Sequence, residues 1–164
     1  MTPHPPSGVR ALDHTADVGI SVRGASLEEL FVRAALGAVW MAAGTVPDDL
    51  IAGAAGQPHE ADGRLDHELV QVSMEAEDRE GLLRSWLREL LFRLEVDGRA
   101  TVAVERIGFM EGGDGGFALT AQIRTLPAPE SPVREIKGVT WHGLVVRPPS
   151  PVDSSWRAQV IFDV

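Results

Sequence analysis

The chain contains no cysteine, which excludes disulfide bonds, thiolate metal sites and cysteine nucleophiles. Its five histidines show no paired spacing that could replace thiolates in a zinc site. No apolar run is long enough to span a bilayer, and the Pro-rich segment 1–8 lacks the apolar core of a signal peptide. We therefore expect a cytoplasmic protein with no membrane association.

A run of basic residues is also missing. Fifteen lysines and arginines stand against 24 aspartates and glutamates, which gives a net charge of −9. Nucleic-acid backbones repel such a surface, because non-specific affinity comes from Lys and Arg contacts to phosphates. We therefore expect no strong direct binding to nucleic acid, so that a role in an RNA pathway would depend on a protein partner. The composition favours no particular oligomeric state.

What the chain does contain is the make-up of one globular domain, with 44% hydrophobic and 24% charged residues in 164 positions. Ser26 and Glu29 form a capping box ahead of apolar residues at helical spacing, and Gly44 is a suitable terminator. A second apolar stripe follows Asp78, a possible N-cap, and ends at Asp97-Gly98. These patterns predict two main helices.

Alternation of apolar and polar residues predicts about seven strands, largely in hairpin order. The predicted strands include 18–23, 69–76, 101–110, 117–126, 136–146 and 156–164, and the Gly-rich segment 111–116 is a hairpin turn. Segment 1–9 is expected to be a flexible N-terminus and 45–67 a long loop. The expected fold is a single α+β domain, with a largely antiparallel or mixed β-sheet and the two helices packed on it.

Carboxylates lie off the apolar face at both ends of the chain. Asp17 precedes the first alternating strand, and Asp163 lies in the last strand, one residue before the C-terminal carboxylate of Val164. If these strands end side by side, the groups make an anionic pocket suited to Ca²⁺ or Mg²⁺. Each half also has an ordinary alternative: His14-x-x-Asp17 as a turn bonded to its own backbone, and Asp163 as a solvated side chain.

Five motifs, in one order, cover the chain nearly end to end. They are Asp13-His14-Thr15-Ala16-Asp17, Gly24-x-Ser26-Leu27-Glu28-Glu29-Leu30-Phe31, Leu82-Leu83-x-x-Trp86-Leu87-x-Glu89-Leu90-Leu91-Phe92, Ile136-Lys137-Gly138-Val139-Thr140-Trp141-His142 and Val160-Ile161-Phe162-Asp163-Val164. Together they resemble the archease family, small acidic proteins that serve as cofactors of the tRNA-splicing RNA ligase. That enzyme joins 2′,3′-cyclic-phosphate or 3′-phosphate ends to 5′-hydroxyl ends in tRNA processing and RNA repair. The resemblance implies a single archease-like domain over 1–164.

The resemblance implies a divalent-cation site at Asp17 and Asp163, to which the Val164 carboxylate could add a ligand. Ca²⁺ is the expected ion, with Mg²⁺ or Mn²⁺ as alternatives. His14 and its neighbour Asp13 would support the site. Imidazole is a poor ligand for Ca²⁺, so His14 is expected to orient Asp17 rather than bind the ion.

Two further residues follow from the same resemblance. Lys137 matches the functional lysine of the family, which would pair with an acid of the ligase or with the metal-bound carboxylates. Without the resemblance, it would be read as a solvated strand lysine. The family usually carries a Gly-Glu pair before this motif, and here the corresponding stretch is 128–131. Glu130 is the candidate equivalent.

The implied function is that of a non-catalytic activator. Archease-like proteins promote guanylylation of the ligase's histidine and its multiple turnover. One alternative is a stand-alone metal-dependent hydrolase using the carboxylates and His14, but the sequence shows no nucleophile with a positioned base and no glycine-rich nucleotide cradle. The other is a general chaperone or scaffold, which would bind unfolded proteins independently of metal and of both aspartates.

Overall fold

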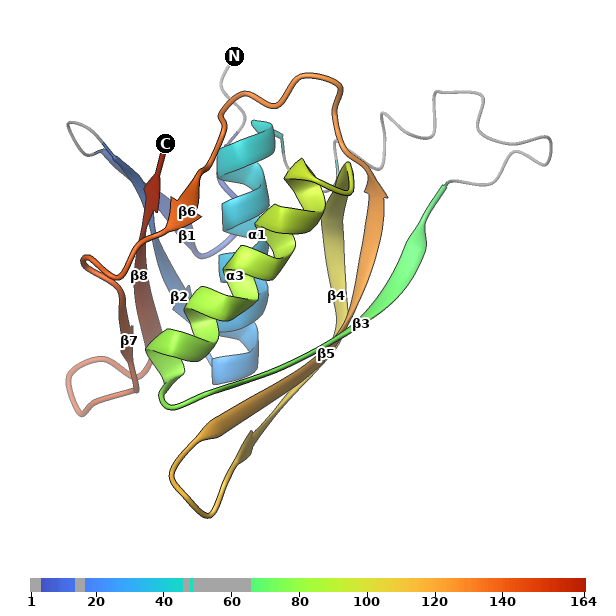
Figure 1. The fold of residues 1–164 in the computed structure, drawn as a ribbon. Coiled ribbons are helices and arrows are strands. Elements are labelled where there is room, and N and C mark those ends of the chain that lie inside the picture. Colours follow the sequence, from blue (N-terminus) through green and yellow to red (C-terminus); the bar gives the residue numbers. More distant parts are fainter. Residues whose placement is uncertain (1–3, 14–16, 46–47, 49–65) are drawn as a thin grey trace.

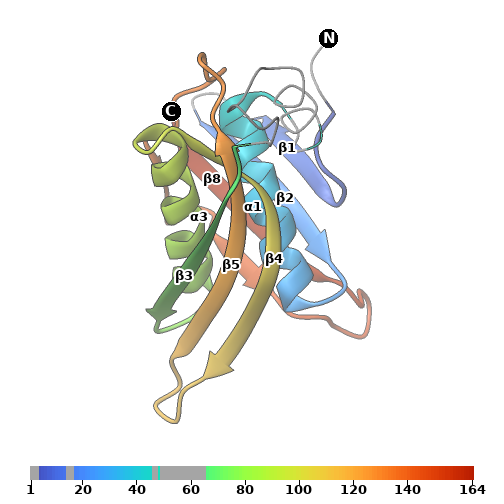
Figure 2. The same ribbon diagram turned by 90° about the vertical axis from the view of Figure 1, so that its right-hand side faces the viewer.

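Two helices lie between two β-sheets in the computed structural model, which describes residues 4–13, 17–45, 48 and 66–164 (Figure 1). After a 90° turn, one sheet lies in front of the helices and the other behind them (Figure 2). The described elements, in chain order, are β1 (Val9–Asp13), β2 (Val18–Gly24), α1 (Leu27–Ala43), β3 (Glu68–Ala76), α3 (Arg79–Glu95), β4 (Arg99–Glu111), β5 (Phe117–Pro127), β6 (Gly138–Val139), β7 (Val145–Arg147) and β8 (Trp156–Asp163). The predicted α+β fold with two main helices is confirmed.

Every strand pairing within the two sheets is antiparallel. One sheet has the order β1-β2-β8-β6, with β7 also paired to β8, and the other has the order β3-β5-β4. The last strand therefore lies beside the second one, over a register that runs from Val18 opposite Phe162 to Gly24 opposite Trp156. This pairing of distant segments positions the site described below.

Helix α1 begins and ends where the sequence predicts. The hydroxyl of Ser26 accepts a hydrogen bond from the Glu29 backbone N–H at 3.1 Å, and the Glu29 carboxylate accepts one from the Ala25 N–H. Gly44 adopts a left-handed conformation with φ of 70°, and its N–H donates to the Trp40 carbonyl at 2.8 Å. Because α1 contacts both β2 and β4, it ties the two sheets together.

Helix α3 has the N-cap and the buried apolar stripe that its sequence predicts. Asp78 accepts a hydrogen bond from the Gly81 N–H at 2.7 Å. Trp86, fully buried in the stripe, donates from its indole nitrogen to the Phe31 carbonyl of α1 at 3.1 Å. The Phe31 ring in turn meets Phe109 of β4 edge-on, with ring centroids 4.9 Å apart. The core therefore runs continuously from one helix to the other and onto the second sheet.

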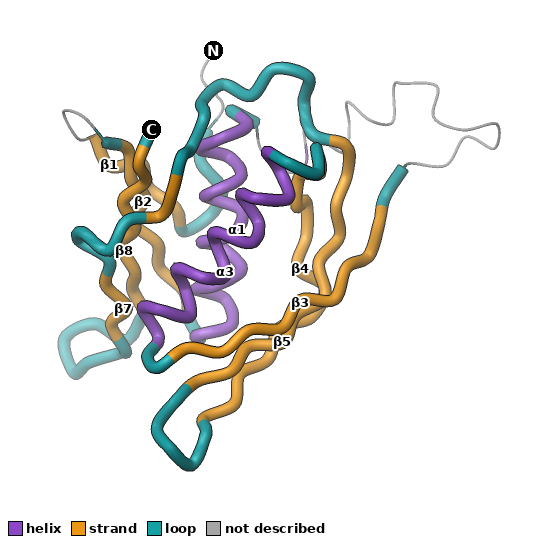
Figure 3. The backbone as a smooth tube through the Cα atoms, viewed as in Figure 1, coloured by secondary structure: helices purple, strands orange, loops and turns teal. Residues whose placement is uncertain are grey.

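The predicted strand over 136–146 is instead two short strands, β6 and β7, separated by a loop over 140–144 (Figure 3). Side chains of α3 form hydrogen bonds with main-chain groups of this segment that a neighbouring strand would otherwise bind. Arg84 donates to the Val139 carbonyl at 2.8 Å, and Glu80 accepts from the Val146 N–H at 3.0 Å. Gly143, with φ of 65°, turns the chain between them. Strand β1 also differs from the prediction, because no alternation of apolar and polar residues indicates a strand over 9–13.

The predicted hairpin turn is confirmed: Gly112 donates to the Gly116 carbonyl at 2.8 Å, and Gly115 has a positive φ of 86°. The long loop expected over 45–67 falls mostly on residues outside the described part. Of the expected flexible segment 1–9, residues 4–9 are described, and Val9 starts β1 as a buried residue. Among the described residues, no helix is long and apolar enough to cross a membrane.

Candidate functional site

The second strand, β2, and the last strand, β8, bring two aspartates close to each other at one end of the five-stranded sheet. Side chains such as Ile20 and Phe162 face the helices and are fully buried. Val18 of β2 pairs with Phe162 of β8. Continued one residue beyond the start of β2, this register aligns Asp17 with Asp163, and the alternation of the two strands assigns both positions to the face turned away from the helices. Asp17 is half-buried and Asp163 is exposed.

This carboxylate pair lacks a compensating cation in the part of the chain that the structure describes. No ion pair there reaches Asp17 or Asp163. Cβ atoms of residues directly opposite in an antiparallel pair are about 4.5–5.5 Å apart, and like charges in that position destabilise the sheet. The arrangement therefore favours a positive charge between the two side chains.

The chemistry of the pair fits a hard divalent cation, since carboxylate oxygens are the ligands that Ca²⁺ and Mg²⁺ prefer. No group of three acidic or histidine side chains gathers among the described residues. Asp17 and Asp163 therefore supply two carboxylates. The other coordination positions of a bound ion would be left to main-chain oxygens, water or groups from a partner.

Lys137 lies at the same end of the sheet. Its backbone N–H donates to the Asp163 carbonyl at 2.8 Å, and its ammonium group donates to an oxygen of the C-terminal carboxylate of Val164 at 3.4 Å. It is the single lysine of the sequence, and its side chain is exposed. The structure thus brings Lys137, Val164 and Asp163 together at one corner of the sheet, with Asp17 on the neighbouring strand.

The other predicted site residues are placed differently. Asp13 ends β1 opposite Val18, and His14 lies outside the described residues. Glu130 is exposed in the connection from β5 to β6. There it lines a separate pocket of about 400 Å³, which is formed with Leu91, Leu94, Glu95, Arg134, Glu135 and others. The lining contains none of the corner residues, so Glu130 stands apart from the carboxylate pair.

Sequence reasoning did not single out Trp141 as a site residue. It lies in the loop between β6 and β7 with 60% of its surface exposed. The Arg84 guanidinium lies 4.8 Å from its ring centroid, and Arg84 is itself anchored to the Val139 carbonyl. Partial burial, and then the neighbouring Arg88, lower the pKa of Arg84. The sequence signal that could have pointed to it is a large aromatic residue between the polar residues Thr140 and His142, four positions after Lys137.

The model of the archease protein family matches residues 10–164. Protein archease of Methanosarcina barkeri is 29% identical over 160 residues, covering 93% of each chain. Protein archease of Thermococcus kodakarensis is 31% identical over 156 residues, covering 93% of this chain and 95% of the relative. The solution structure of Methanobacterium thermoautotrophicum protein 1598 matches with a TM-score of 0.63 at 28% identity, covering 96% of this chain and 99% of that one. The chain belongs to the archease family.

Proposed function

We propose that this protein is a non-catalytic activator of the tRNA-splicing RNA ligase, promoting guanylylation of the ligase and its multiple turnover. The observation that supports this best is the cross-strand pair of Asp17 and Asp163 beside Lys137. Two opposed carboxylates without a described counter-charge form a site that gains from binding a cation. Family membership supports this choice of pathway, and the carboxylate pair is the part of the molecule through which we propose that the protein acts.

Within this proposal, Asp17 and Asp163 hold a divalent cation, Ca²⁺ first and Mg²⁺ or Mn²⁺ as alternatives. When bound, the ion supplies positive charge at the corner of the sheet, where phosphate oxygens of the partner's nucleotide could approach. Lys137 adds a second positive group close to the same corner. Its ammonium group, held only by one main-chain oxygen among the described residues, is free to turn toward an acid of the ligase.

The donor set supports an activator over a stand-alone hydrolase. A hydrolytic metal site needs ligands that fix the ion and a group that handles the proton of the attacking water. Apart from the C-terminal carboxylate of Val164, the described residues offer Asp17 and Asp163 at this corner, and no group of three or more acidic or histidine side chains able to hold a metal ion. A site that is open in this way is suited to completion by the groups of a partner protein.

Trp141 gives the partner a contact point in the loop that follows β6, the strand paired with the end of β8. An exposed tryptophan held in place by an arginine is typical of binding hot spots, because little conformational entropy is lost when it is buried. We propose that Trp141 and Arg84 contact the ligase. Replacement of such a residue by alanine costs about 2 kcal/mol or more of binding energy, which is roughly 30-fold in affinity.

The test follows guanylate transfer from GTP to the ligase of the same organism, with a divalent ion and sub-stoichiometric amounts of this protein. Wild type should speed labelling. Asp17→Asn and Asp163→Asn should not do so at any concentration, and Glu77→Gln, which changes an exposed carboxylate away from the site, should behave as wild type. Full stimulation by folded Asp17→Asn would overturn the role of the carboxylate pair, and no stimulation by wild type would overturn the function.

Trp141→Ala separates docking from activation in the same assay. It should raise the concentration needed for half-maximal stimulation by roughly 30-fold while leaving the maximum unchanged. An unchanged half-maximal concentration would remove Trp141 from the proposed contact surface without affecting the role of the carboxylates.

A further inference from the structure

The far end of the same sheet face carries a row of arginines. Arg23 of β2 lies opposite Arg157 of β8, and Arg157 lies opposite Arg147 of β7. All three are at outward positions, in line with Asp17 and Asp163 in the strand alternation. Arg10 of β1 is opposite Ser21, one outward position along from Arg23. A chain with a net charge of −9 thus places four of its 15 basic residues close together on one part of one face.

This arginine row, Arg23, Arg157 and Arg147, holds more positive charge than its surroundings balance. Neighbouring strands are about 4.8 Å apart, so the three guanidinium groups start from backbone positions spread over about 10 Å. Like charges directly opposite each other on a sheet are unfavourable. The row therefore needs negative partners.

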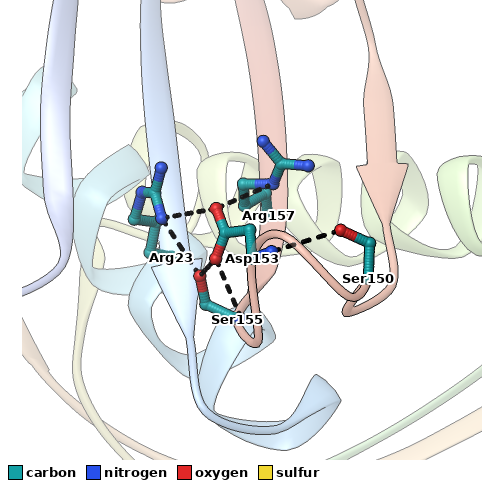
Figure 4. Close-up of polar contacts among 5 residues, drawn as sticks. All are labelled: Arg23, Ser150, Asp153, Ser155 and Arg157. Atoms are coloured by element: carbon teal, nitrogen blue, oxygen red, sulfur yellow. Dashed lines mark hydrogen bonds and ion pairs between the residues drawn. The ribbon is translucent and has the colours of Figure 1, made fainter.

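Asp153 supplies one such partner from the loop between β7 and β8 (Figure 4). Its carboxylate lies 2.8 Å from an Arg23 nitrogen and 3.5 Å from Nε of Arg157. The hydroxyl and backbone N–H of Ser155 also donate to it. These hydrogen bonds, and then Arg23, lower the pKa of Asp153 to about 2, so the carboxylate is ionised at neutral pH. One negative charge against three positive ones leaves two positive charges without a partner in this cluster.

Arg147 is the arginine that this network does not reach. Its side chain is exposed and makes no ion pair or hydrogen bond within the described residues. With Arg157 it lines a pocket of about 170 Å³, completed by Ser21, Val145, Ala158 and Gln159. Its polar side chains, those of Ser21, Arg147, Arg157 and Gln159, can all donate hydrogen bonds, and no acidic residue belongs to it. Gln159 is held in place by donating to the Gly143 carbonyl at 3.1 Å.

We propose that this pocket binds a phosphate group, of a nucleotide or of an RNA strand, between Arg147 and Arg157. Arginine presents its N–H groups in a planar fork that matches phosphate oxygens, and such charge-assisted hydrogen bonds are among the strongest in proteins. A phosphate carries up to two negative charges and three acceptor oxygens, which match the two unbalanced positive charges better than the single charge of a carboxylate.

The phosphate site and the carboxylate pair are separate places on one strand. Arg157 and Asp163 are six residues apart on β8, or about 20 Å at the rise of an extended strand. The arginine pocket can therefore be tested on the isolated protein without metal, and its failure would leave the proposed activation of the ligase standing. Because the net charge of the whole protein is negative, we expect the affinity of this site for phosphate to be low.

The experiment is an NMR titration of ¹⁵N-labelled protein in EDTA, following backbone amides and arginine Nε–Hε groups. The probes are inorganic phosphate, pyrophosphate, GTP, a single-stranded RNA hexanucleotide and a glutamate-rich peptide. Saturable shifts confined to Ser21, Arg147, Arg157 and Gln159 are expected with phosphate-bearing probes. If RNA binds more tightly than GTP, the bound phosphate belongs to an RNA backbone. If GTP binds more tightly than RNA, it belongs to a nucleotide.

Arg147→Gln should weaken this binding about tenfold, as expected for the loss of a hydrogen bond between charged groups. Arg106→Gln, an exposed arginine of the other sheet, is the matched control and should leave the affinity unchanged. The proposal is overturned if no phosphate probe gives saturable shifts at these residues, if Arg147→Gln binds as wild type does, or if only the acidic peptide binds.

Discussion

Asp153, in the loop between β7 and β8, has different surroundings from Asp17 and Asp163 at the other end of the sheet face. The Asp153 carboxylate is paired with Arg23 and Arg157 and accepts a hydrogen bond from Ser155, so its negative charge is compensated within the molecule. Asp17 and Asp163 oppose each other and meet no described cation. The first arrangement stabilises the loop that carries it. The second carries a repulsion that a bound cation would relieve, and for that reason we propose it as the functional site.

Asp163→Asn should change the stability of the protein in opposite directions with and without metal. In EDTA, loss of one of the two opposed charges should raise the free energy of unfolding by roughly 0.2–1 kcal/mol. With Ca²⁺ at about 100 times its dissociation constant, wild type should gain about 2.7 kcal/mol and the variant far less. Urea denaturation under both conditions measures this. A variant that is less stable than wild type in EDTA would contradict the proposed repulsion.

Asp153→Asn should remove a stabilisation that depends on pH. The pKa of Asp153 falls from 3.8 to about 2 on folding, so its contribution is complete above the unfolded value and is lost as the pH falls through the folded one. Thermal denaturation from pH 7 to pH 2.5 should show the difference between wild type and variant constant above about pH 5. The difference should then narrow below pH 4. If the stability difference between wild type and Asp153→Asn did not depend on pH, the ionised Asp153 carboxylate would have no special role. Glu77→Gln is the control.

The helices of this protein begin at residues that the local sequence already marks. Ser26 and Asp78 each accept a hydrogen bond from a backbone N–H of the first helical turn, groups that a helix cannot satisfy by itself. Helix α1 depends on its cap in particular, because it packs against both sheets.

Ser26→Ala should lower the free energy of unfolding by about 1 kcal/mol, as expected for the loss of an N-cap. Chemical denaturation followed by far-ultraviolet circular dichroism measures the change. Ser73→Ala, at an exposed position of β3, should have little effect and is the matched control. Equal effects of the two replacements would show that the cap adds no stability.

In the whole molecule, the helices form the only described layer between the sheets, and Phe31 connects the parts. Its ring contacts Phe109 of β4, and its carbonyl accepts from Trp86 of α3. The two sheets should therefore lose their structure together, although each has its own strand pairings.

Phe31→Ala should cost about 3–5 kcal/mol and lower the protection of both sheets alike. Native-state hydrogen exchange of amides in β5 and β8 measures this for each sheet separately. Wild type should give the same unfolding free energy for both strands. If β8 lost protection in the variant while β5 kept it, the sheets would be independent units.

Local features of the sequence were sufficient for the parts of the fold that depend on neighbouring residues. The caps at Ser26 and Asp78, the left-handed Gly44 and the 112–116 hairpin follow from side-chain chemistry within a few positions. The alternation in 156–164 correctly placed Phe162 inward and Asp163 outward. Where side chains from a distant element replace a strand neighbour, as Arg84 and Glu80 do for 136–146, local patterns fail.

By itself, the sequence determined the helices, most strands, the exclusion of cysteine chemistry and the family to which the chain belongs. Only the tertiary structure decided that β8 pairs with β2, because this pairing joins segments more than a hundred residues apart and no local pattern encodes its register. That pairing sets Asp17 opposite Asp163 and aligns Arg23, Arg157 and Arg147 in one row. The tertiary structure also decided that Glu130, in the connection from β5 to β6, lines a pocket with residues near the C-terminal ends of α1 and α3.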